Sequence, residues 1–551
     1  MKFLKFAPPL FCILFCLSAR TQAQVTMTIG QNFVGSTYNI ETQALPPDCD
    51  GTIGPNEFVE FINDQFAVYD KTTGSNTYRI DAGTFWSQAG ISPAAYSDPR
   101  IIYDPSSQRW FATMVDLNPN AADPTTQNNN FLLAVSVSSD PAGNWQAVRF
   151  RASPSSVAFA DFPTLGVDAN AVYISGDFFH GETNPLGAGL VSIPKADLLL
   201  PTPVITNRTW FGIADYSVRG QVYQPVMCLD GTSSGNVVAV GNIGMDIIQY
   251  SNLFCFAVQN AGGPGATLTA PVNLTVPPYQ VPYNADFDAP LFTPTQSDGT
   301  SALEGNDARI SARVFAVAGV IYAVHNTELN NRMAIRWYRI SATTRALLEV
   351  GTLADNTQDL FFPAIAANAS GTVVIGYNAC GPGTNNLTVS CYAVAGQTSG
   401  GVTTFGTPLL LQAGVNDYHG DDETLLDPFL GLPPYSRWGD YNSIANDPSD
   451  PSRFWTMIMY PSDGATQDVY STQITELITA SPRPKLTITE TGTNATISWA
   501  SSFTGFTLQK NTSISSPLTW SNVPQAQVTN GNSISVTISA NSGKQFFRLK
   551  K

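Results

Sequence analysis

The chain has 551 residues, of which 43% are hydrophobic and 13% are charged, and its formal net charge is −15. The charged fraction is about half of the roughly 25% found in ordinary soluble domains. Binding to nucleic acid or anionic lipid depends on clustered Lys and Arg, so this acidic, Lys-poor composition speaks against such partners. With 43 Gly, 38 Pro and no long amphipathic helical pattern, the composition predicts an all-β protein.

The N-terminus has the pattern of an export signal. Lys2 and Lys5 form a positive start, residues 10–17 are an apolar run, and Thr21-Gln22-Ala23 offers small residues for cleavage. We therefore predict a signal peptide over residues 1–23. Without it the chain has 24 basic and 42 acidic residues, a net charge of −18.

This segment has two alternative interpretations. Cleavage after Ala19 is the rival position, and a lipid anchor at Cys16 is disfavoured by the bulky Phe15 before it. No later stretch approaches the roughly 20 apolar residues of a membrane-spanning helix. We expect a monomer without a transmembrane segment, secreted or displayed at the cell surface.

After a short leader at residues 24–44, the chain consists of short β-rich runs separated by Asp, Pro, Gly and Ser turns. The clearest unit runs from Asp98 to Phe150, where four apolar runs are joined by turns such as Asp104-Pro105-Ser106-Ser107. This pattern is typical of an antiparallel four-stranded meander.

Similar units recur along most of the chain. Their first strands are predicted at residues 46–51, 98–104, 160–167, 223–227, 306–310, 360–366 and 437–444. Seven starts, each followed by further β runs, predict a β-propeller of seven blades over residues 45–480. The spacing between starts is uneven, so six or eight blades stay open.

A second, smaller domain follows the Ser-Pro-Arg-Pro linker at residues 481–484. Residues 485–551 alternate polar and apolar side chains, and Asn530-Gly531 is a hairpin signal. This predicts a small fibronectin-like β-sandwich. The segment resembles C-terminal modules of exported proteins of some environmental bacteria, which end in Phe-Phe-Arg-Leu as residues 546–549 do.

Five cysteines remain after the signal peptide. Cys380 and Cys391 lie on predicted neighbouring strands, and an oxidising compartment permits pairing, so we predict a disulfide between them. The pairing of Cys49, Cys228 and Cys255 stays open, with a role as small apolar core residues favoured.

Three motifs carry a family resemblance: the run from Asp98-Pro99-Arg100 to Asp104-Pro105, the run from Ser138 to Trp145, and Arg437-Trp438-Gly439-Asp440-Tyr441. The chain resembles exported bacterial propellers that are related in fold to sialidase-like (Asp-box) propellers. In the second motif Ser138, Asp140 and Trp145 match an Asp box and Gly143 is displaced by one position. Asp boxes stabilise turns away from the active site, so the resemblance implies fold rather than activity.

The first strands of propeller blades start on one face, around the central channel. The polar residues at these starts are therefore expected to converge on one site, which could bind a carbohydrate, an anionic group or a cation. The candidates are Asp50, Asp98, Arg100, Asp161, Asp307, Arg309, Arg437 and Asp440. The alternative is structural: Asp caps backbone N–H groups at each start and Arg pairs with it. We favour this alternative for any single residue and weigh the two equally for the ring.

Sialidases bind a sugar carboxylate with three arginines, and the resemblance would give this role to Arg100, Arg309 and Arg437. However, the Arg-Ile-Pro motif is missing, since Arg79-Ile80 is followed by Asp81, and no Tyr/Glu nucleophile pair can be assigned. No metal site and no cofactor are predicted. Ca²⁺ at an acidic loop such as 421–423 is conceivable, but the spacing is not that of an EF-hand.

The leading hypothesis is a binding protein for glycan or another extracellular ligand. The first alternative is a sialidase-like glycoside hydrolase that uses acidic residues of the central pocket. The second is a non-catalytic scaffold that holds protein partners through its loops.

Overall fold

The computed structural model describes residues 25–181, 184–241, 249–282, 294–299, 303–382, 387–420, 436–480, 484–501, 505–513, 520–531, 533–540 and 543–550. The predicted signal peptide lies outside these ranges, as does nearly all of the predicted linker. Within them, no helix is both long and apolar enough to cross a membrane. Residues 25–480 form one compact unit, and residues 481–551 belong to a second.

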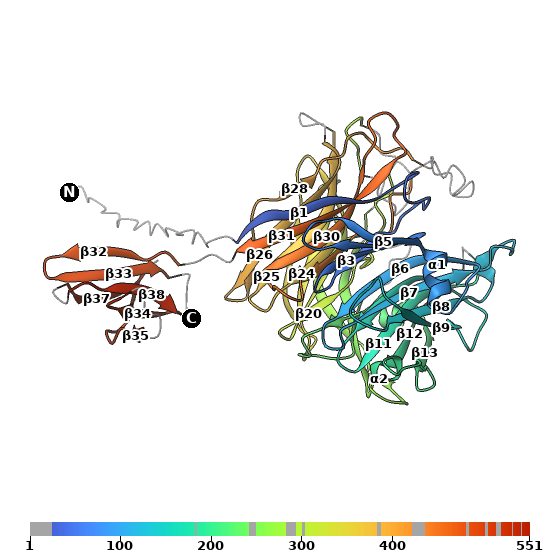
Figure 1. Ribbon diagram of the computed structural model, residues 1–551, viewed down its shortest axis with the longest axis horizontal. Helices are drawn as coiled ribbons and strands as arrows, with labels where there is room; N and C mark the ends of the chain where they lie inside the picture. The colour runs from blue at the N-terminus through green and yellow to red at the C-terminus, as the bar shows by residue number, and fades with distance from the viewer. Residues whose placement is uncertain are drawn as a thin grey trace, which may run out of the picture. The chain divides into compact units, whose positions relative to one another are not determined.

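The larger unit is built from antiparallel sheets whose strands follow one another in chain order (Figure 1), which confirms the all-β prediction. The first sheet has β2 (Asp50–Ile53), β3 (Glu57–Ile62), β4 (Gln65–Asp70) and β5 (Asn76–Asp81). The second has β6 (Ala95–Asp104), β7 (Arg109–Leu117), β8 (Asn130–Ser136) and β9 (Trp145–Arg151). The third has β10 (Phe159–Val167), β11 (Ala171–Phe179), β12 (Pro185–Pro194) and β13 (Thr209–Ala214).

The next two groups of strands are hydrogen-bonded to one another. One group has β14 (Gln221–Pro225), β16 (Asn236–Val240), β17 (Gln249–Gln259), β18 (Thr267–Leu268) and β19 (Val272–Gln280). The other has β20 (Phe315–Val317), β21 (Val320–Glu328), β22 (Met333–Ser341) and β23 (Leu347–Leu353). They are joined where β19 pairs with β21, at Gln280 and Glu328. The short strand β15 (Met227–Cys228) pairs with β20 in parallel.

The remaining sheet before the closure has β24 (Asp359–Ala367), β25 (Thr372–Gly381), β26 (Leu387–Ser399), β27 (Val402–Phe405) and β28 (Leu409–Gln412). The helical segments are short and lie in the connections: α1 (Ala82–Gln88), η1 (Pro124–Thr126), α2 (Lys195–Leu198) and α3 (Tyr216–Arg219).

The two ends of the larger unit meet in one sheet. β29 (Ser443–Asn446), β30 (Arg453–Pro461) and β31 (Tyr470–Ala480) are completed by β1 (Thr26–Thr37), which pairs antiparallel with β31 (Figure 1). β1 lies within residues 24–44, which the sequence suggested were a leader. The first strand of the chain therefore closes the structure instead of preceding it.

The first strands of these sheets contact one another in a closed ring. β2 contacts β6, β6 contacts β10, β10 contacts β14 and β15, β15 contacts β20, β20 contacts β24, and β29 contacts both β24 and β2. Each sheet buries its faces against its neighbours, so a strand such as β24 is buried along its whole length. This is the arrangement of a β-propeller around a central channel. Three predicted first strands differ in position. Residues 46–49, 306–310 and 437–442 lie outside the strands, which begin at Asp50, Phe315 and Ser443.

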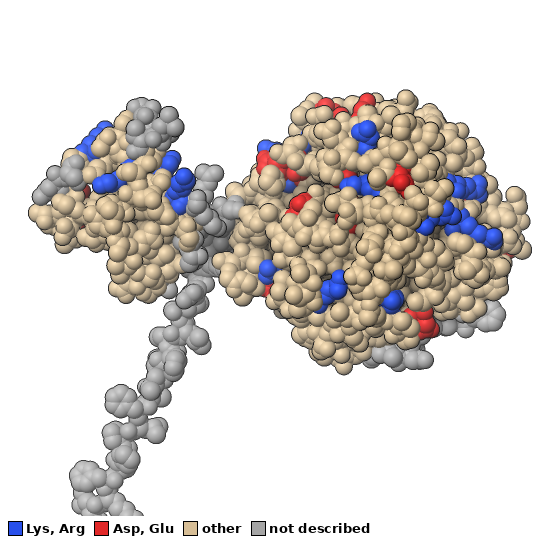
Figure 2. Space-filling model, turned by 90° about the horizontal axis from the view of Figure 1, so that it is seen from below, with Lys and Arg blue, Asp and Glu red and all other residues tan. Residues whose placement is uncertain are grey.

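The smaller unit has two sheets. One has β32 (Thr487–Thr491), β33 (Asn494–Ala500), β37 (Ser533–Ser539) and β36 (Val528–Asn530), and the other has β35 (Ser521–Asn522), β34 (Thr507–Asn511) and β38 (Phe546–Lys550). Ile497, Trp499, Leu508 and Val536 form its core. Lys and Arg side chains are visible in blue on this smaller body in Figure 2.

The predicted disulfide between Cys380 and Cys391 is wrong. All five cysteines of the larger unit are free and buried. Cys380 and Cys391 do lie on neighbouring strands, β25 and β26, but the residue opposite Cys391 is Asn378. Cys380 donates to the carbonyl of Thr295 instead, and burial raises the pKa of its thiol. Both cysteines are apolar core residues.

Candidate functional site

The candidate site lies where the first strands begin. Near each start the backbone passes through a left-handed residue, with positive φ angles at Asp48, Asp98, Phe162, Val222, Asn306, Phe362 and Gly439. The pairing with the second strand is interrupted at several of these residues, as in a β-bulge. The left-handed conformation costs a non-glycine residue about 1–3 kcal/mol, so it needs compensating contacts.

Asp and Asn side chains supply much of this compensation. Asn63 accepts a hydrogen bond from the N–H of Asp98 at 2.8 Å, and Asp98 accepts one from the N–H of Phe162 at 3.0 Å. Asp177 and Asn326 accept in the same way from Val222 and Phe362. Each bond joins one sheet to the next, so these polar side chains hold neighbouring blades together.

Three carboxylates from different parts of the ring meet at this end of the channel. Asp48 precedes β2, Asp98 lies on β6 and Asp440 precedes β29, and each offers an oxygen within 4.8 Å of the other two. Asp48 and Asp98 are only 2% and 5% exposed. Burial, followed by the charge of Asp440, raises the pKa of both. Not all of these groups can be ionised together without cost.

The same three carboxylates also have hydrogen-bond partners. Asp48 accepts from the N–H of Asp440 at 2.9 Å and from the amide of Asn63 at 2.8 Å. Asp440 accepts from the guanidinium of Arg437 at 3.1 Å. Ca²⁺ requires six to eight oxygen ligands, and several of these oxygens are already used by N–H donors. The cluster could offer three carboxylate ligands to a cation. Its hydrogen bonds fit a structural role, in which the carboxylates link neighbouring blades, better than a cation site. The acidic loop 421–423 lies outside the described residues.

Asp161 stands beside this cluster, and Asp177 lies opposite Asp161 in the pairing of β10 with β11. Burial raises the pKa of each to about 7; the charges of Asp98 and Asp440 contribute at Asp161, and Arg309 opposes the rise at both. Asp177 is held by the N–H of Val222. Asp161 also accepts from a backbone N–H, that of Phe162, and has no side-chain donor among the described residues. It is half-buried, whereas Asp177 is only 4% exposed. Asp161 is therefore the carboxyl group best placed to exchange a proton or a hydrogen bond with a ligand near neutral pH.

Two arginines stand among these acids, and both are engaged. Arg309 makes a bidentate pair with Asp307, with distances of 2.9 and 2.8 Å, and lies over the ring of Phe162. Arg437 contacts Glu304 at 2.6 Å in addition to Asp440. Since carboxyl groups outnumber guanidinium groups here, the site disfavours an anionic ligand.

The end of the channel with these acids is called the mouth. Arg100 is buried further along the channel than the mouth. Arg100 is 2% exposed and donates to the carbonyls of Pro163 and Ser311 at 2.9 and 3.0 Å. Its guanidinium carbon lies 3.3 Å from the centroid of the Tyr441 ring. Tyr441 in turn donates to the carbonyl of Pro99. These contacts stabilise the packing between blades and leave Arg100 out of reach of a ligand at the mouth.

A buried ion pair between Arg313 and Asp50 connects distant parts of the ring across the channel. Arg313 donates to Asp50 at 2.6 Å and to the carbonyl of Ile101 at 2.8 Å. Asp50 also accepts from the N–H of Ile101 at 2.9 Å. The pair is almost completely removed from water, with Asp50 1% and Arg313 7% exposed, and this burial raises the pKa of Asp50 and lowers that of Arg313.

The structure thus divides the predicted ring into two layers. At the mouth it brings together Asp98, Asp161, Asp307, Arg309, Arg437 and Asp440, while Asp50 and Arg100 belong to the buried layer below. The three predicted arginines do not form a carboxylate clamp, because Arg100 binds backbone carbonyls and the other two bind acids.

Sequence reasoning missed four members of these layers: Asp48, Asn63, Asp177 and Arg313. Asp48 stands two residues before Asp50 in the same turn and could have been included. Asn63 follows the second strand of its sheet, β3, and Asp177 lies on the second strand of another, β11. Arg313 lies beyond the predicted strand at 306–310. No local pattern in the sequence marks those three.

The opposite end of the channel has a different character. A cavity of about 170 Å³ lies where the first strands end, and its lining includes Ile53, Tyr103, Met227, Phe315, Val317 and Ala445. Most of its lining is apolar, with Thr52, Asp230 and Asn446 as the polar members, whereas the carboxyl cluster lies at the end where the strands begin.

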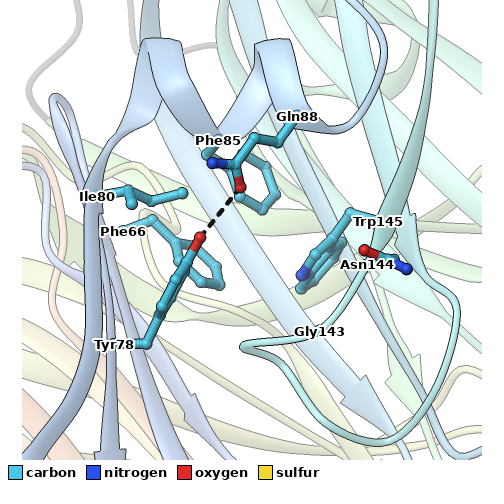
Figure 3. A pocket seen from close by; sticks show the side chains of 8 residues that line it. All are labelled: Phe66, Tyr78, Ile80, Phe85, Gln88, Gly143, Asn144 and Trp145. Atoms are coloured by element: carbon cyan, nitrogen blue, oxygen red, sulfur yellow. Dashed lines mark hydrogen bonds between the residues drawn. The ribbon is translucent and has the colours of Figure 1, made fainter.

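A further small cavity lies at the outer edge of the first two sheets, beside α1. Phe66, Phe85 and Trp145 form its walls, and Tyr78 donates to Gln88 across it at 3.0 Å (Figure 3). Its volume is about 30 Å³, close to the space of one water molecule. It is too small for a ligand site.

No protein-family model and no curated protein matches the chain. Similar solved structures include an exo-1,5-α-L-arabinanase from a bovine ruminal metagenomic library, with 10% identity, a TM-score of 0.30 and coverage of 66% of this chain and 96% of that one. The sialidase of Trypanosoma rangeli has 9% identity, a TM-score of 0.28 and coverage of 92% and 59%. The polysaccharide lyase Uly1 has 9% identity, a TM-score of 0.38 and coverage of 79% and 90%. We draw no functional conclusion from likenesses of this size.

Proposed function

We propose that the chain is an exported binding protein whose propeller binds a glycan or another extracellular ligand at the acidic mouth of its channel. The observation that carries this proposal is the convergence of Asp48, Asp98 and Asp440 within 4.8 Å, with Asp161 beside them. Carboxyl groups from separate sheets meet at one place, at an end of the channel where the strands begin.

The chemistry of the mouth suits an uncharged polyhydroxyl ligand. An ionised carboxylate accepts hydrogen bonds from hydroxyl groups, and a protonated carboxyl group donates one. Asp161, with a pKa of about 7, is present in both forms near neutral pH. Because Arg309 and Arg437 are already paired with acids, a ligand carboxylate would meet no unpaired guanidinium there.

The finer architecture is part of the same proposal. The groups of strands over residues 45–480 correspond to seven blades, and β1, from the segment before residue 45, is the closing strand of the last blade. The two sheets of residues 485–551 correspond to a β-sandwich. The predicted signal peptide would send a bacterial protein of this kind out of the cell or to its surface.

A second candidate is a glycoside hydrolase. It is favoured by Asp161, whose pKa of about 7 suits a general acid, and by Asp98 next to it as a potential base. In such a reaction Asp161 would protonate the leaving oxygen while the base activates water. The sialidase version is not favoured, because the arginine clamp does not form.

The test is a glycan array together with a turnover assay on purified residues 24–551. Asp161→Asn and Asp98→Asn remove charge while keeping size, and Asn tolerates the left-handed backbone at position 98. Asp140→Asn, in an exposed turn, is the matched control. Binding that is lost in the two mouth variants and kept in the control supports the proposal. Turnover lost in the same variants would establish the hydrolase. A folded wild-type chain that binds no glycan would contradict glycan binding and the hydrolase, and would favour the scaffold or a ligand other than a glycan.

A further inference from the structure

The C-terminal unit has the opposite charge to the propeller. Residues 481–551 contain seven Lys and Arg residues and one acid, Glu490, whereas residues 24–480 contain 17 basic and 41 acidic residues. The net charges are +6 and −24. The net charge of the whole chain is negative, yet its last roughly 70 residues form a basic module.

Several of these basic side chains share one face of the sheet β35-β34-β38. In the register of β34 with β38, Leu508 lies opposite Leu549 and faces the core. Gln509 lies opposite Arg548 and Thr507 opposite Lys550, so Arg548 and Lys550 point away from the core. Phe546 lies on this outward face too.

Two of the cations are held against aromatic rings. The guanidinium carbon of Arg548 lies 4.5 Å from the centroid of the Trp520 ring, and Arg548 donates to Gln509 at 2.9 Å. The ammonium group of Lys544 lies 5.2 Å from the centroid of the Phe546 ring. Such contacts order the charged groups without neutralising them. Lys544, Phe546, Arg548, Lys550 and Trp520 are called the basic face below; Lys544 and Lys550 are exposed.

We propose that the basic face binds an anionic polysaccharide. No acid lies on it, and Glu490 is in the other sheet. Because Arg548 and Lys544 cover the rings of Trp520 and Phe546, these rings offer neither a protruding wedge for a bilayer nor a free platform for a nucleic-acid base. The basic face therefore offers a ligand mainly its closely spaced positive charges. These complement a flexible polysaccharide with a negative charge on many of its sugar units.

This inference goes beyond the proposed function and does not depend on it. A polyanion is repelled by the propeller, with its net charge of −24, and binds through the basic face alone. The consequence for an exported chain is retention on a polyanionic matrix while the mouth of the propeller keeps its own ligand specificity.

The experiment measures binding of residues 24–551 to immobilised polygalacturonate at 50 and 200 mM NaCl. We expect binding that weakens at the higher salt and a roughly tenfold lower affinity in Arg548→Gln/Lys550→Gln, since two charged contacts are lost. The matched control is Arg149→Gln/Arg151→Gln, which removes two exposed charges from β9 of the propeller and is expected to bind within about twofold of wild type. Arg548→Lys keeps the charge and should retain most of the affinity.

Three results would overturn the proposal. One is equal binding of wild type and Arg548→Gln/Lys550→Gln, with both folded by circular dichroism. Another is equal binding of wild type to fully methyl-esterified polygalacturonate, which has the same backbone without charge. The third is tighter binding to vesicles with 30 mol% anionic phospholipid, or to a thymidine 30-mer, than to polygalacturonate. None of these results depends on whether the propeller mouth binds a glycan.

Discussion

The propeller and the C-terminal unit are both antiparallel β structures, yet they use charge in opposite ways. The propeller places acids inside the ring, where Asp48, Asp98 and Asp177 bind backbone N–H groups of neighbouring sheets. The C-terminal unit places cations outside, on the strand β38. Buried charge in the first case holds the fold together, and exposed charge in the second is available to a partner.

The largest effect is expected from removing β1. A chain that starts at residue 45 leaves β31 with an unpaired edge and removes the contact between the two ends of the propeller. We expect this chain to lose the cooperative unfolding transition of the propeller, measured by calorimetry. A chain that ends at residue 480 is the matched truncation and should keep that transition. A normal propeller transition in the chain from 45 would show that residues 24–44 are a dispensable leader.

The next largest effect concerns the buried pair of Arg313 and Asp50. Arg313→Met leaves Asp50 buried without its partner, which costs about 3–5 kcal/mol. Arg548→Met in the C-terminal unit removes an outward-facing cation and should cost about 1 kcal/mol or less. Chemical denaturation measures both. The double variant Arg313→Met/Asp50→Leu should recover much of the lost stability. If it recovers none, the hydrogen bonds of this pair to Ile101 contribute more than the attraction between the two charges.

A smaller effect on the stability of the fold is expected from a change in pH. The pKa of Asp161 is about 7 in the folded chain and about 3.9 in an unfolded one. Between these values the folded state holds more protons, so this group favours folding at low pH and loses that contribution as the pH rises through 7. Asp161→Asn cannot ionise.

We therefore expect Asp161→Asn to melt about 1–3 °C above wild type at pH 7.5, with the difference shrinking at pH 5. The control Asp140→Asn should show no such pH-dependent difference. A lower melting temperature for Asp161→Asn at pH 7.5 would mean that the ionised carboxylate stabilises the fold, contrary to its position among Asp98 and Asp440.

The sequence predicted much of the fold and part of the site. Turn-separated β runs indicated the propeller, and Asp98, Asp161 and Asp440 were found because they stand beside local motifs at strand starts. Asp177 and Arg313 were not found, because their roles depend on pairing between distant sheets. The disulfide prediction failed since register, which local sequence does not reveal, places Asn378 opposite Cys391. Arg100 looked like a ligand residue, but its burial, its bonds to backbone carbonyls and its stacking on Tyr441 show that it is structural.

The most direct test of the contrast is a crossed binding measurement. Binding to the best uncharged glycan from the array and to polygalacturonate is measured for wild type, Asp161→Asn and Arg548→Gln/Lys550→Gln. We predict that Asp161→Asn loses only the uncharged glycan and that the double variant loses only polygalacturonate. Loss of both ligands in either variant, with the fold intact, would contradict two separate sites of opposite charge.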